Sequence, residues 1–205
     1  ALNEDFFKEE IVPLKTGRNT ILDHDETIRR KLDLDKIKKL KAAFKDQGTI
    51  TAATAANISD GACLLLITSK KFANQHNWPI LAQIGQIEQA GVQPELFGYG
   101  PVTAARKILK SQNKTISQYD LFEINEAFAA QTIVDAKELS IPYDKINLNG
   151  GSLAFGHPLA ASGARIIFTL AREIKKESLN SGIAMICVGG GMGMAMEIYS
   201  NEKNI

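Results

Sequence analysis

The chain has 205 residues, of which 44% are hydrophobic and 23% are charged, and its formal net charge at pH 7 is +1. These values are typical of a globular protein with one large domain, or one domain and an appendage. The near-neutral charge gives no reason to expect a nucleic-acid partner, and no apolar run is long enough to cross a membrane.

The few cysteines and histidines limit the chemistry further. Two cysteines, Cys63 and Cys187, do not make a disulfide framework, so we expect a reducing compartment such as the cytoplasm. Three histidines, with no Cys or His at ligand spacing, do not predict a zinc site. We therefore expect no structural metal.

The first part of the chain is rich in charge. Residues 1–47 carry 21 of the 47 acidic and basic side chains, so we expect a surface-rich segment that is incompletely buried. Apolar side chains recur at helical spacing within this segment. The spacing predicts a helix over Asp33–Lys45, with Asp33 as its N-cap.

From about residue 60 the sequence alternates between strand and helix patterns, which predicts a layered α/β domain. The continuous apolar run Ala62–Thr68 is typical of a strand buried on both faces, and we assign Cys63 within it to the core. The expected strands are 62–68, 80–90, 121–124, 146–148, 182–188 and 194–199, and the expected helices are 69–77, 102–110, 126–139 and 161–177.

Three short motifs place a polar side chain where a strand meets a turn or a helix. They are Asn125–Phe128, Gly156–Pro158 and Cys187–Gly191. An amide, an imidazole and a thiol brought together suit acyl transfer and carbanion chemistry. We therefore expect Asn125, His157 and Cys187 to meet in one pocket.

Each of these residues also has a structural alternative. Asn125 suits the N-cap of the following helix, His157 a hydrogen-bonded turn, and Cys187 inert packing. The glycines beside His157 and Cys187 favour a ligand-lining role, because glycine lets the backbone approach a ligand closely. Gly189 offers a backbone N–H for an oxyanion hole.

Together the motifs resemble those of the thiolase family. Asn125–Ala130, Asn149–Arg165 and Cys187–Gly193 follow one another in the order and spacing of that family, and Gly98–Val102 and Asp25–Arg29 fit it as well. The resemblance covers nearly the whole chain. Three motifs in register are far more specific than any one alone.

The resemblance implies the layered α/β fold of thiolases, in which two similar halves with mixed five-stranded sheets stack and a loop domain is inserted in the first. Residues 1–59 would be the end of the loop domain, 60–78 the last strand and helix of the first half, and 79–205 the complete second half. The family's nucleophilic cysteine would precede Ala1. We therefore expect the C-terminal part of an acyltransferase, inactive alone.

The resemblance also implies roles in acyl transfer between coenzyme A thioesters, by Claisen condensation or by thiolysis of a 3-ketoacyl-CoA. His157 would activate the missing cysteine and, with a water held by Asn125, bind the thioester oxygen. Cys187 would move the proton at the α-carbon, which requires a pKa near the working pH. The Gly189 N–H would join a second oxyanion hole. The expected substrate is acetyl-CoA or another acyl-CoA, as in fatty acid metabolism, and no metal or redox cofactor is implied.

Three further residues would contact coenzyme A. Arg29 aligns with a family arginine near the nucleotide end, where a guanidinium suits a phosphate or adenine, although an isolated arginine is more often simply exposed. Ala56 stands where many relatives carry a serine that holds the pantetheine, which puts affinity or substrate preference in question. Phe128 is expected in the pocket wall.

Two other hypotheses are open. A non-catalytic thiolase-like module would bind coenzyme A or a partner subunit, but it has no need of Asn125, His157 and Cys187 together. A condensing enzyme of the ketosynthase type generally lacks the C-terminal cysteine, so Cys187 argues against it. Losing the first half would expose apolar surface, so we expect association with that half or with a second copy, and a homo-oligomer overall.

Overall fold

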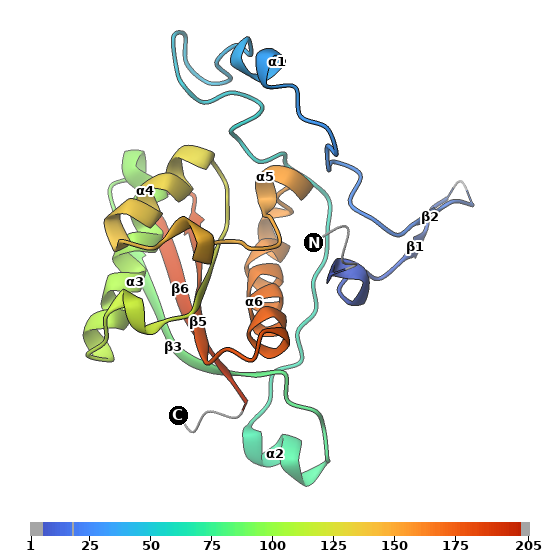
Figure 1. Ribbon diagram of the computed structural model, residues 1–205, viewed down its shortest axis with the longest axis vertical. Coiled ribbons are helices and arrows are strands. Elements are labelled where there is room, and N and C mark those ends of the chain that lie inside the picture. The colour runs from blue at the N-terminus through green and yellow to red at the C-terminus, as the bar shows by residue number, and fades with distance from the viewer. Residues whose placement is uncertain (1–5, 18, 202–205) are drawn as a thin grey trace.

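The computed structural model describes residues 6–17 and 19–201, and a four-stranded mixed β-sheet lies at its centre (Figure 1). The strands are β3 (Ala82–Gly91), β4 (Leu121–Ile124), β5 (Ser181–Val188) and β6 (Met192–Ser200). Their order in the sheet is β3-β6-β5-β4. β4 and β5 are parallel, whereas β6 is antiparallel to both of its neighbours and forms the expected glycine-joined hairpin with β5.

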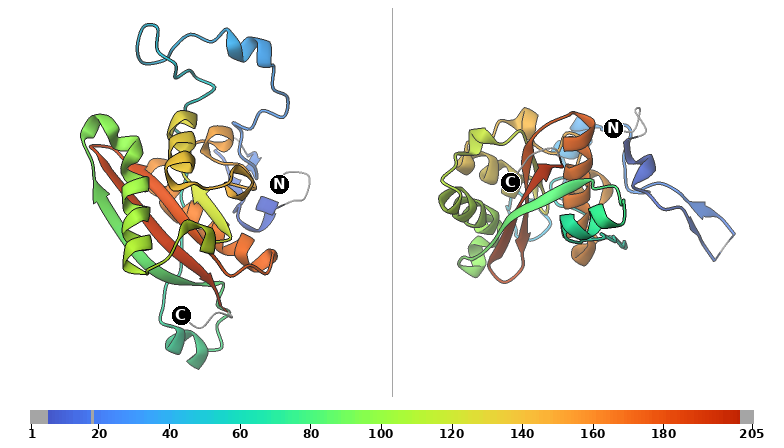
Figure 2. Two further views of the ribbon diagram at one scale, coloured as in Figure 1. Left: turned by 60° about the vertical axis from the view of Figure 1, so that its left-hand side comes forward. Right: turned by 90° about the horizontal axis from the view of Figure 1, so that it is seen from below.

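Helices cover both faces of the sheet, which confirms the layered α/β architecture (Figures 1 and 2). α3 (Gly100–Ser111) and α4 (Ala129–Leu139) lie on one face and α6 (Leu159–Lys176) on the other. Side chains alternate along β4, so Phe122 and Ile124 join the apolar cluster with α3 while Leu121 joins the one with α6. All of β4 is buried as a result.

The strand expected at 146–148 is reduced to a single bridge between Ile146 and Phe122. Asn147 N–H still donates to the Phe122 carbonyl at 3.0 Å, but Asn147 then turns with a φ of 48°. Its side chain takes the place of a strand: Oδ1 accepts from the Ile124 N–H and Nδ2 donates to the Ile124 carbonyl, both at 2.8 Å. The expectation of five strands is therefore wrong, because a side-chain amide satisfies this edge of β4.

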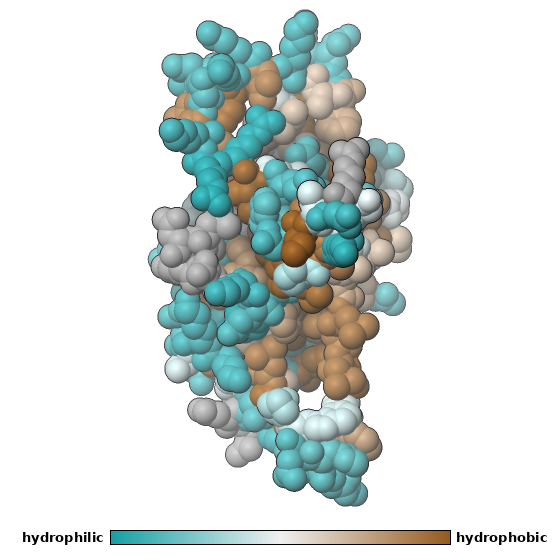
Figure 3. All heavy atoms as spheres, turned by 90° about the vertical axis from the view of Figure 1, so that its right-hand side faces the viewer, coloured by the Kyte–Doolittle hydropathy of each residue, from teal (hydrophilic) through white to brown (hydrophobic). Residues whose placement is uncertain are grey.

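The buried strand expected at 62–68 is not formed either. The segment pairs with no strand of the described residues, and Leu64, Leu66 and Ile67 are 94%, 78% and 66% exposed. A buried strand needs hydrogen-bonding neighbours and a covering layer on each face, which this part of the structure does not supply. Cys63, expected in the core, is only partly buried. The start of the segment runs beside α6, and Figure 3 shows the apolar side chains gathered on this side.

Residues 6–59 extend from the layers as an open segment, as their charge density predicts (Figure 1). They include the paired two-residue strands β1 (Leu14–Lys15) and β2 (Ile21–Leu22). The helix expected over 33–45 forms only as α1 (Leu34–Lys38), with Asp33 as the predicted N-cap. It is short because none of its residues is buried, and a helix without a packing surface is marginally stable.

The other helices form with shifted ends. α2 (Lys70–Gln75) has Ser69 as its N-cap, and α3 has Pro101 in its first turn. α4 begins at Ala129, later than expected, so Asn125 is not its N-cap. The sequence does not predict α5 (Ser152–Phe155). Short 3₁₀ helices are η2 (Phe6–Glu9), η3 (Pro94–Tyr99), η4 (Ile116–Gln118) and η5 (Tyr143–Lys145). Across the described residues, every helix is too short or too polar to traverse a lipid bilayer.

A buried carboxylate ties β6 to the rest of its layer. Glu197 is 1% exposed and accepts hydrogen bonds from Tyr119 and Tyr199, from the Gln86 N–H and from Lys114. Burial by itself would raise the pKa of Glu197, but these donors outweigh it and hold the pKa below its usual value. Glu197 is therefore ionised in the folded chain.

Replacing Glu197 by glutamine should destabilise the fold by about 2 kcal/mol at pH 7, because the partly buried Lys114 ammonium loses its counter-charge and Tyr119 and Tyr199 lose a charged acceptor. The pKa of Glu197 is lowered by folding, so its stabilisation is present above the unfolded-state pKa of about 4.3 and disappears as pH falls through the folded-state value. Urea unfolding of both proteins between pH 7 and pH 3 should show that the difference between their free energies of unfolding shrinks as the pH falls. Glu95→Gln, at an exposed position, serves as the control. A difference in free energy of unfolding that does not change with pH would contradict an ionised Glu197.

Candidate active site

The carboxyl ends of β4 and β5 bring two of the three motifs to one edge of the sheet. The N–H of Asn125, the residue after β4, donates to the Met185 carbonyl of β5 at 2.9 Å. Cys187 lies two residues further along β5, next to the end of the strand. Asn125 and Cys187 are 0% and 8% exposed, so both are enclosed by the helices on the two faces.

His157 joins this edge through direct contact with Asn125. Its Nε2 lies 3.4 Å from Asn125 Nδ2, and its Nδ1 lies 2.6 Å from the Ser162 hydroxyl in the first turn of α6. Gly156 has a φ of 98°, and a Cβ there would lie 1.9 Å from Ser59 Oγ, so only glycine fits the turn that aims the imidazole. The structure thus brings together the amide and the imidazole, and no hydrogen bond among the described residues joins them to Cys187.

An upstream segment lies between these motifs and ties them together. Ala56 N–H donates to the carbonyl that precedes Phe128, at 3.0 Å, and Ala55 forms a bridge with Phe128 itself. The next residue, Asn57, accepts from the His157 N–H at 2.7 Å. Ala56, expected to lie near coenzyme A, is therefore placed between Phe128 and the loop that carries His157.

The imidazole of His157 is held in its neutral form. Burial, followed by the positive charge of Arg165, lowers the pKa of His157, because both disfavour a second positive charge at this position. A neutral imidazole is the form that accepts a proton from a thiol. The site can therefore act as a general base at neutral pH.

Glu126 braces the loop that leads to His157. Its Oε1 accepts from Asn147 Nδ2 at 2.9 Å, and its Oε2 accepts from the Leu153 N–H at 3.1 Å. The carboxylate therefore links the end of β4 to the first turn of α5, where an acidic group also suits the helix dipole. In the described structure, Glu126 therefore fixes the backbone at the start of α5.

Cys187 is a protonated thiol in this structure. Burial, and then the negative charge of Asp135, raises the pKa of Cys187 to about 11. The role implied by the resemblance calls for a pKa nearer the working pH, so here the group starts as a proton donor and not as a thiolate. Gly189 follows in the exposed hairpin turn, where an added Cβ would meet nothing within 4 Å, so this end of β5 is open to approach.

Asp135 is a buried acid that no motif reveals. It lies one helical turn from Gln131 on α4, and the two are 0% and 7% exposed. The Gln131 amide donates to Asp135 Oδ2, while Asp135 Oδ1 and Gln131 Oε1 have no partner among the described residues. Burial raises the pKa of Asp135 to about 7. The only signal in the sequence is an acid at helical spacing with buried residues.

Of the other candidates, Phe128 lies at the site and Arg29 is an exposed loop residue. The Phe128 ring packs edge-on against Phe44 and Phe97, at centroid distances of 5.8 and 6.0 Å. The Thr27 hydroxyl, close to Arg29, donates to a carbonyl of α5 at 3.2 Å and so ties this loop to the site. Within the described ranges, no three His, Cys, Asp or Glu side chains are grouped to hold a metal ion.

Comparison with known proteins agrees with this geometry. Family models described as the N-terminal and C-terminal domains of thiolase match residues 1–71 and 78–200. The chain is 43% identical, over 196 residues, to an acetyl-CoA acetyltransferase of Chromobacterium violaceum, and the match covers 94% of this chain and 50% of that protein.

Solved structures give the same result. Human mitochondrial 3-ketoacyl-CoA thiolase in complex with CoA has a TM-score of 0.93 and 35% identity, covering 98% of this chain and 51% of that one. The dimeric peroxisomal thiolase of Saccharomyces cerevisiae has a TM-score of 0.88 and 37% identity, covering 97% and 50%. The fold and its sheet-edge motifs thus define a layered α/β protein. The chain belongs to the thiolase family, and it spans about half the length of the curated relatives it matches.

Replacing Asp135 by asparagine should lower the pKa of Cys187, because the negative charge that raises it is removed while burial is kept. Iodoacetamide should then alkylate Cys187 faster at a pH of about 8.5, where Asp135 is ionised in the unmodified chain. The rate is followed by mass spectrometry across pH, with Cys63→Ser in both proteins to remove the second thiol. If the alkylation rate had the same midpoint pH in both proteins, the ionisation of Cys187 would not depend on the charge of Asp135.

Proposed function

We propose that this chain forms the half of a thiolase active site that handles the thioester oxygen and the α-proton of an acyl-CoA. The observation that carries the proposal is the contact between Asn125 Nδ2 and His157 Nε2 at the sheet edge where β5 ends with Cys187 and Val188. An amide donor, a neutral imidazole and a protonated thiol are groups that Claisen chemistry between thioesters can use.

The proposed thiolysis begins with His157. The neutral imidazole takes the proton of a nucleophilic thiol, which attacks the 3-keto carbon of a 3-ketoacyl-CoA. When the carbon–carbon bond breaks, the electron pair moves onto the thioester oxygen as an enolate. Asn125, directly or through a water, and the newly charged His157 then donate hydrogen bonds to that oxygen.

Cys187 completes the proton balance. Its Sγ–H gives a proton to the enolate α-carbon, which forms an acetyl-CoA and leaves a Cys187 thiolate. That thiolate takes the proton of an incoming coenzyme A thiol, and the resulting coenzyme A thiolate attacks the enzyme-bound acyl group. The intermediate collapses to a shortened acyl-CoA and expels the nucleophilic thiolate, which recovers its proton from His157. The Gly189 N–H would stabilise the oxyanion of that second step. Condensation is the reverse sequence, and neither direction needs a metal or a redox cofactor.

We assign the nucleophilic thiol to the part of a thiolase that the relatives carry beyond the matched half. Cys63 is not proposed for it, because its segment lies on the outer side of α6 and burial raises the pKa of the Cys63 thiol. The exposed side chains Leu64, Leu66 and Ile67 are the proposed contact with that part, or with a second copy of the chain. The yeast relative is dimeric, so we propose a homo-oligomer for the complete enzyme.

The proposed coenzyme A contacts follow the loop near α5 and the segment beside Phe128. Arg29 would pair with a phosphate, because a guanidinium makes bidentate contacts with such groups. Ala56 has no hydroxyl for the pantetheine, so backbone groups and the Phe128 ring would hold it instead. Both cysteines are free, in keeping with a proposed location in the cytoplasm.

A second candidate function is a non-catalytic module that binds coenzyme A or a partner subunit. The observation that favours it is the Cys187 pKa of about 11, which is high for a group that must exchange protons in both directions. A partner that displaces water or adds a positive charge near Cys187 would change this value, so the activity of the complete site decides between the two.

The catalytic proposal is tested in a fusion of this chain to the preceding part of the Chromobacterium violaceum relative. The fusion should cleave acetoacetyl-CoA in the presence of coenzyme A. His157→Ala and Cys187→Ala should each lower kcat by about 10² to 10⁴, because each removes a proton-transfer group. His76→Gln, on the distant α2 side, should keep the activity. A fusion whose turnover survives both active-site changes would refute the assigned roles.

The partner proposal predicts that the 205-residue chain associates in solution. Replacing Leu64 and Leu66 by glutamine should shift sedimentation toward the monomer, because the most exposed apolar side chains of the segment are removed. The matched control is Leu32→Gln with Leu34→Gln, which changes two leucines of similar exposure in the charge-rich segment. Equal effects of the two pairs, or a monomeric unmodified chain at high concentration, would count against a specific surface.

A further inference from the structure

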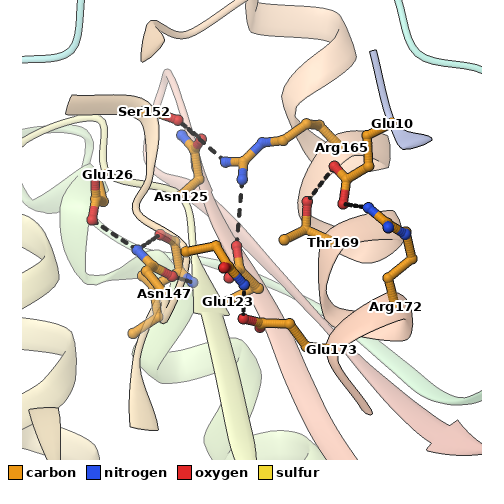
Figure 4. Close-up of polar contacts among 12 residues, drawn as sticks. Glu10, Glu123, Asn125, Glu126, Asn147, Ser152, Arg165, Thr169, Arg172 and Glu173 are labelled. Carbon is orange, nitrogen blue, oxygen red and sulfur yellow. Dashed lines mark hydrogen bonds and ion pairs between the residues drawn. The ribbon is translucent and has the colours of Figure 1, made fainter. Parts of the chain in front are cut away.

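A network of polar side-chain contacts leads from Glu123 to His157. Arg165, on α6, lies 3.4 Å from Glu123 Oε2 through Nη1 and 3.4 Å from Ser152 Oγ through Nη2. Ser152 Oγ lies 2.7 Å from Asn125 Oδ1, and Asn125 Nδ2 lies 3.4 Å from His157 Nε2. Figure 4 shows Arg165 reaching from its helix to both Ser152 and Glu123.

Among the described residues, one arrangement of hydrogens gives Ser152, Asn125 and His157 a partner each. A guanidinium has N–H donors and no acceptor, so Arg165 donates to the oxygen of Ser152. Ser152 then has one hydroxyl proton to give, and Asn125 is the partner at 2.7 Å. The atom of Asn125 that receives this proton must be its oxygen, so the NH₂ group of the amide faces His157.

Arg165 is well placed to impose this direction. Its guanidinium also lies over the Phe155 ring, 4.8 Å from the centroid, and is paired with Glu123, which is 0% exposed. Ser152 and Asn125 are 1% and 0% exposed, so bulk solvent does not compete for either side chain. The orientation of the amide is therefore set by the protein groups around it.

The orientation of Asn125 in turn sets the tautomer of His157. An N–H that points at Nε2 requires an unprotonated Nε2, so the proton of the neutral ring lies on Nδ1 and is donated to Ser162 Oγ at 2.6 Å. Arg165 is the charged group that acts on the imidazole, and its positive charge favours the same neutral form. Nε2 is then the unprotonated nitrogen of the ring and can receive a thiol proton when a substrate displaces the long contact with Asn125.

We propose that Ser152 is a positioning residue, which holds the Asn125 amide with its N–H groups toward His157 and the substrate oxygen. With the amide reversed, a carbonyl oxygen would face the place where negative charge develops, and the donor would be lost. The catalytic consequence rests on the function proposed above. The amide orientation and the His157 tautomer do not, and they can be measured on the chain itself.

The first test is ¹⁵N NMR of the imidazoles in the 205-residue chain. It has three histidines, so His24→Gln and His76→Gln leave His157 as the sole signal. The expected result above the His157 pKa is a ring protonated at Nδ1 and unprotonated at Nε2. A neutral ring protonated at Nε2 would overturn the proposal without any change at Ser152.

The second test is Ser152→Ala in the same chain. The amide loses the group that fixes it, so its oxygen can turn to the ring; the Nε2–H tautomer should grow and the pKa of His157 should rise. Asn125→Asp presents oxygen on both sides and should shift the pKa in the same direction. Ser111→Ala removes a hydroxyl that only donates to the Ile108 carbonyl, and should change neither. An unchanged tautomer and pKa in a folded Ser152→Ala chain would overturn the proposal.

The fusion enzyme supplies the catalytic readout. Ser152→Ala should lower kcat about tenfold with little change in KM, because the donor is misplaced for the developing charge while substrate contacts remain. Ser152→Thr, which keeps the hydroxyl, should recover the NMR result of the unmodified chain. An inactive fusion with the expected tautomer would contradict the proposed function alone, whereas an active fusion insensitive to Ser152→Ala would contradict the positioning role.

Discussion

The parallel pairing of β4 with β5 is the interaction on which the candidate site depends. Its register sets Ile124 opposite Met185, so the residues just beyond this pair lie at one edge of the sheet. Asn125 and Cys187 come from chain segments far apart in the sequence, yet they share that edge because parallel strands end on the same side. α3, α4 and α6 bury the strands on both faces, which makes every polar contact there stronger and every unmade one costly.

Desolvation sets the charge state of this edge. It lowers the pKa of His157 and raises those of Cys187 and Asp135, so each group is moved toward its neutral form. Burial likewise raises the pKa of Glu123 well above its usual range. Arg165 keeps its charge between Glu123 and Ser152, and it gives direction to hydrogen bonds that would otherwise be ambiguous.

The two expected strands that do not form show what a sheet requires. Ile146 makes one bridge, and the Asn147 amide then satisfies the backbone of Ile124 in place of further strand residues. The segment 62–68 has the composition of a buried strand but no neighbour among the described residues, so its leucines face outward. An apolar composition shows that a segment can be buried as a strand, but the segment is buried only where a neighbouring strand pairs with it.

The sequence by itself determined the class of fold, the strands β3 to β6 and the main helices, because hydrophobic period, glycine and proline act over a few neighbouring positions. It also located Asp33 as an N-cap. Only the tertiary structure decided that Asn125 bonds Ser152 instead of capping α4, that Asp135 lies near Cys187, and that Arg165 directs the amide toward His157. Those outcomes depend on contacts between segments distant in the chain, and a local pattern carries no information about which buried donors and acceptors will meet.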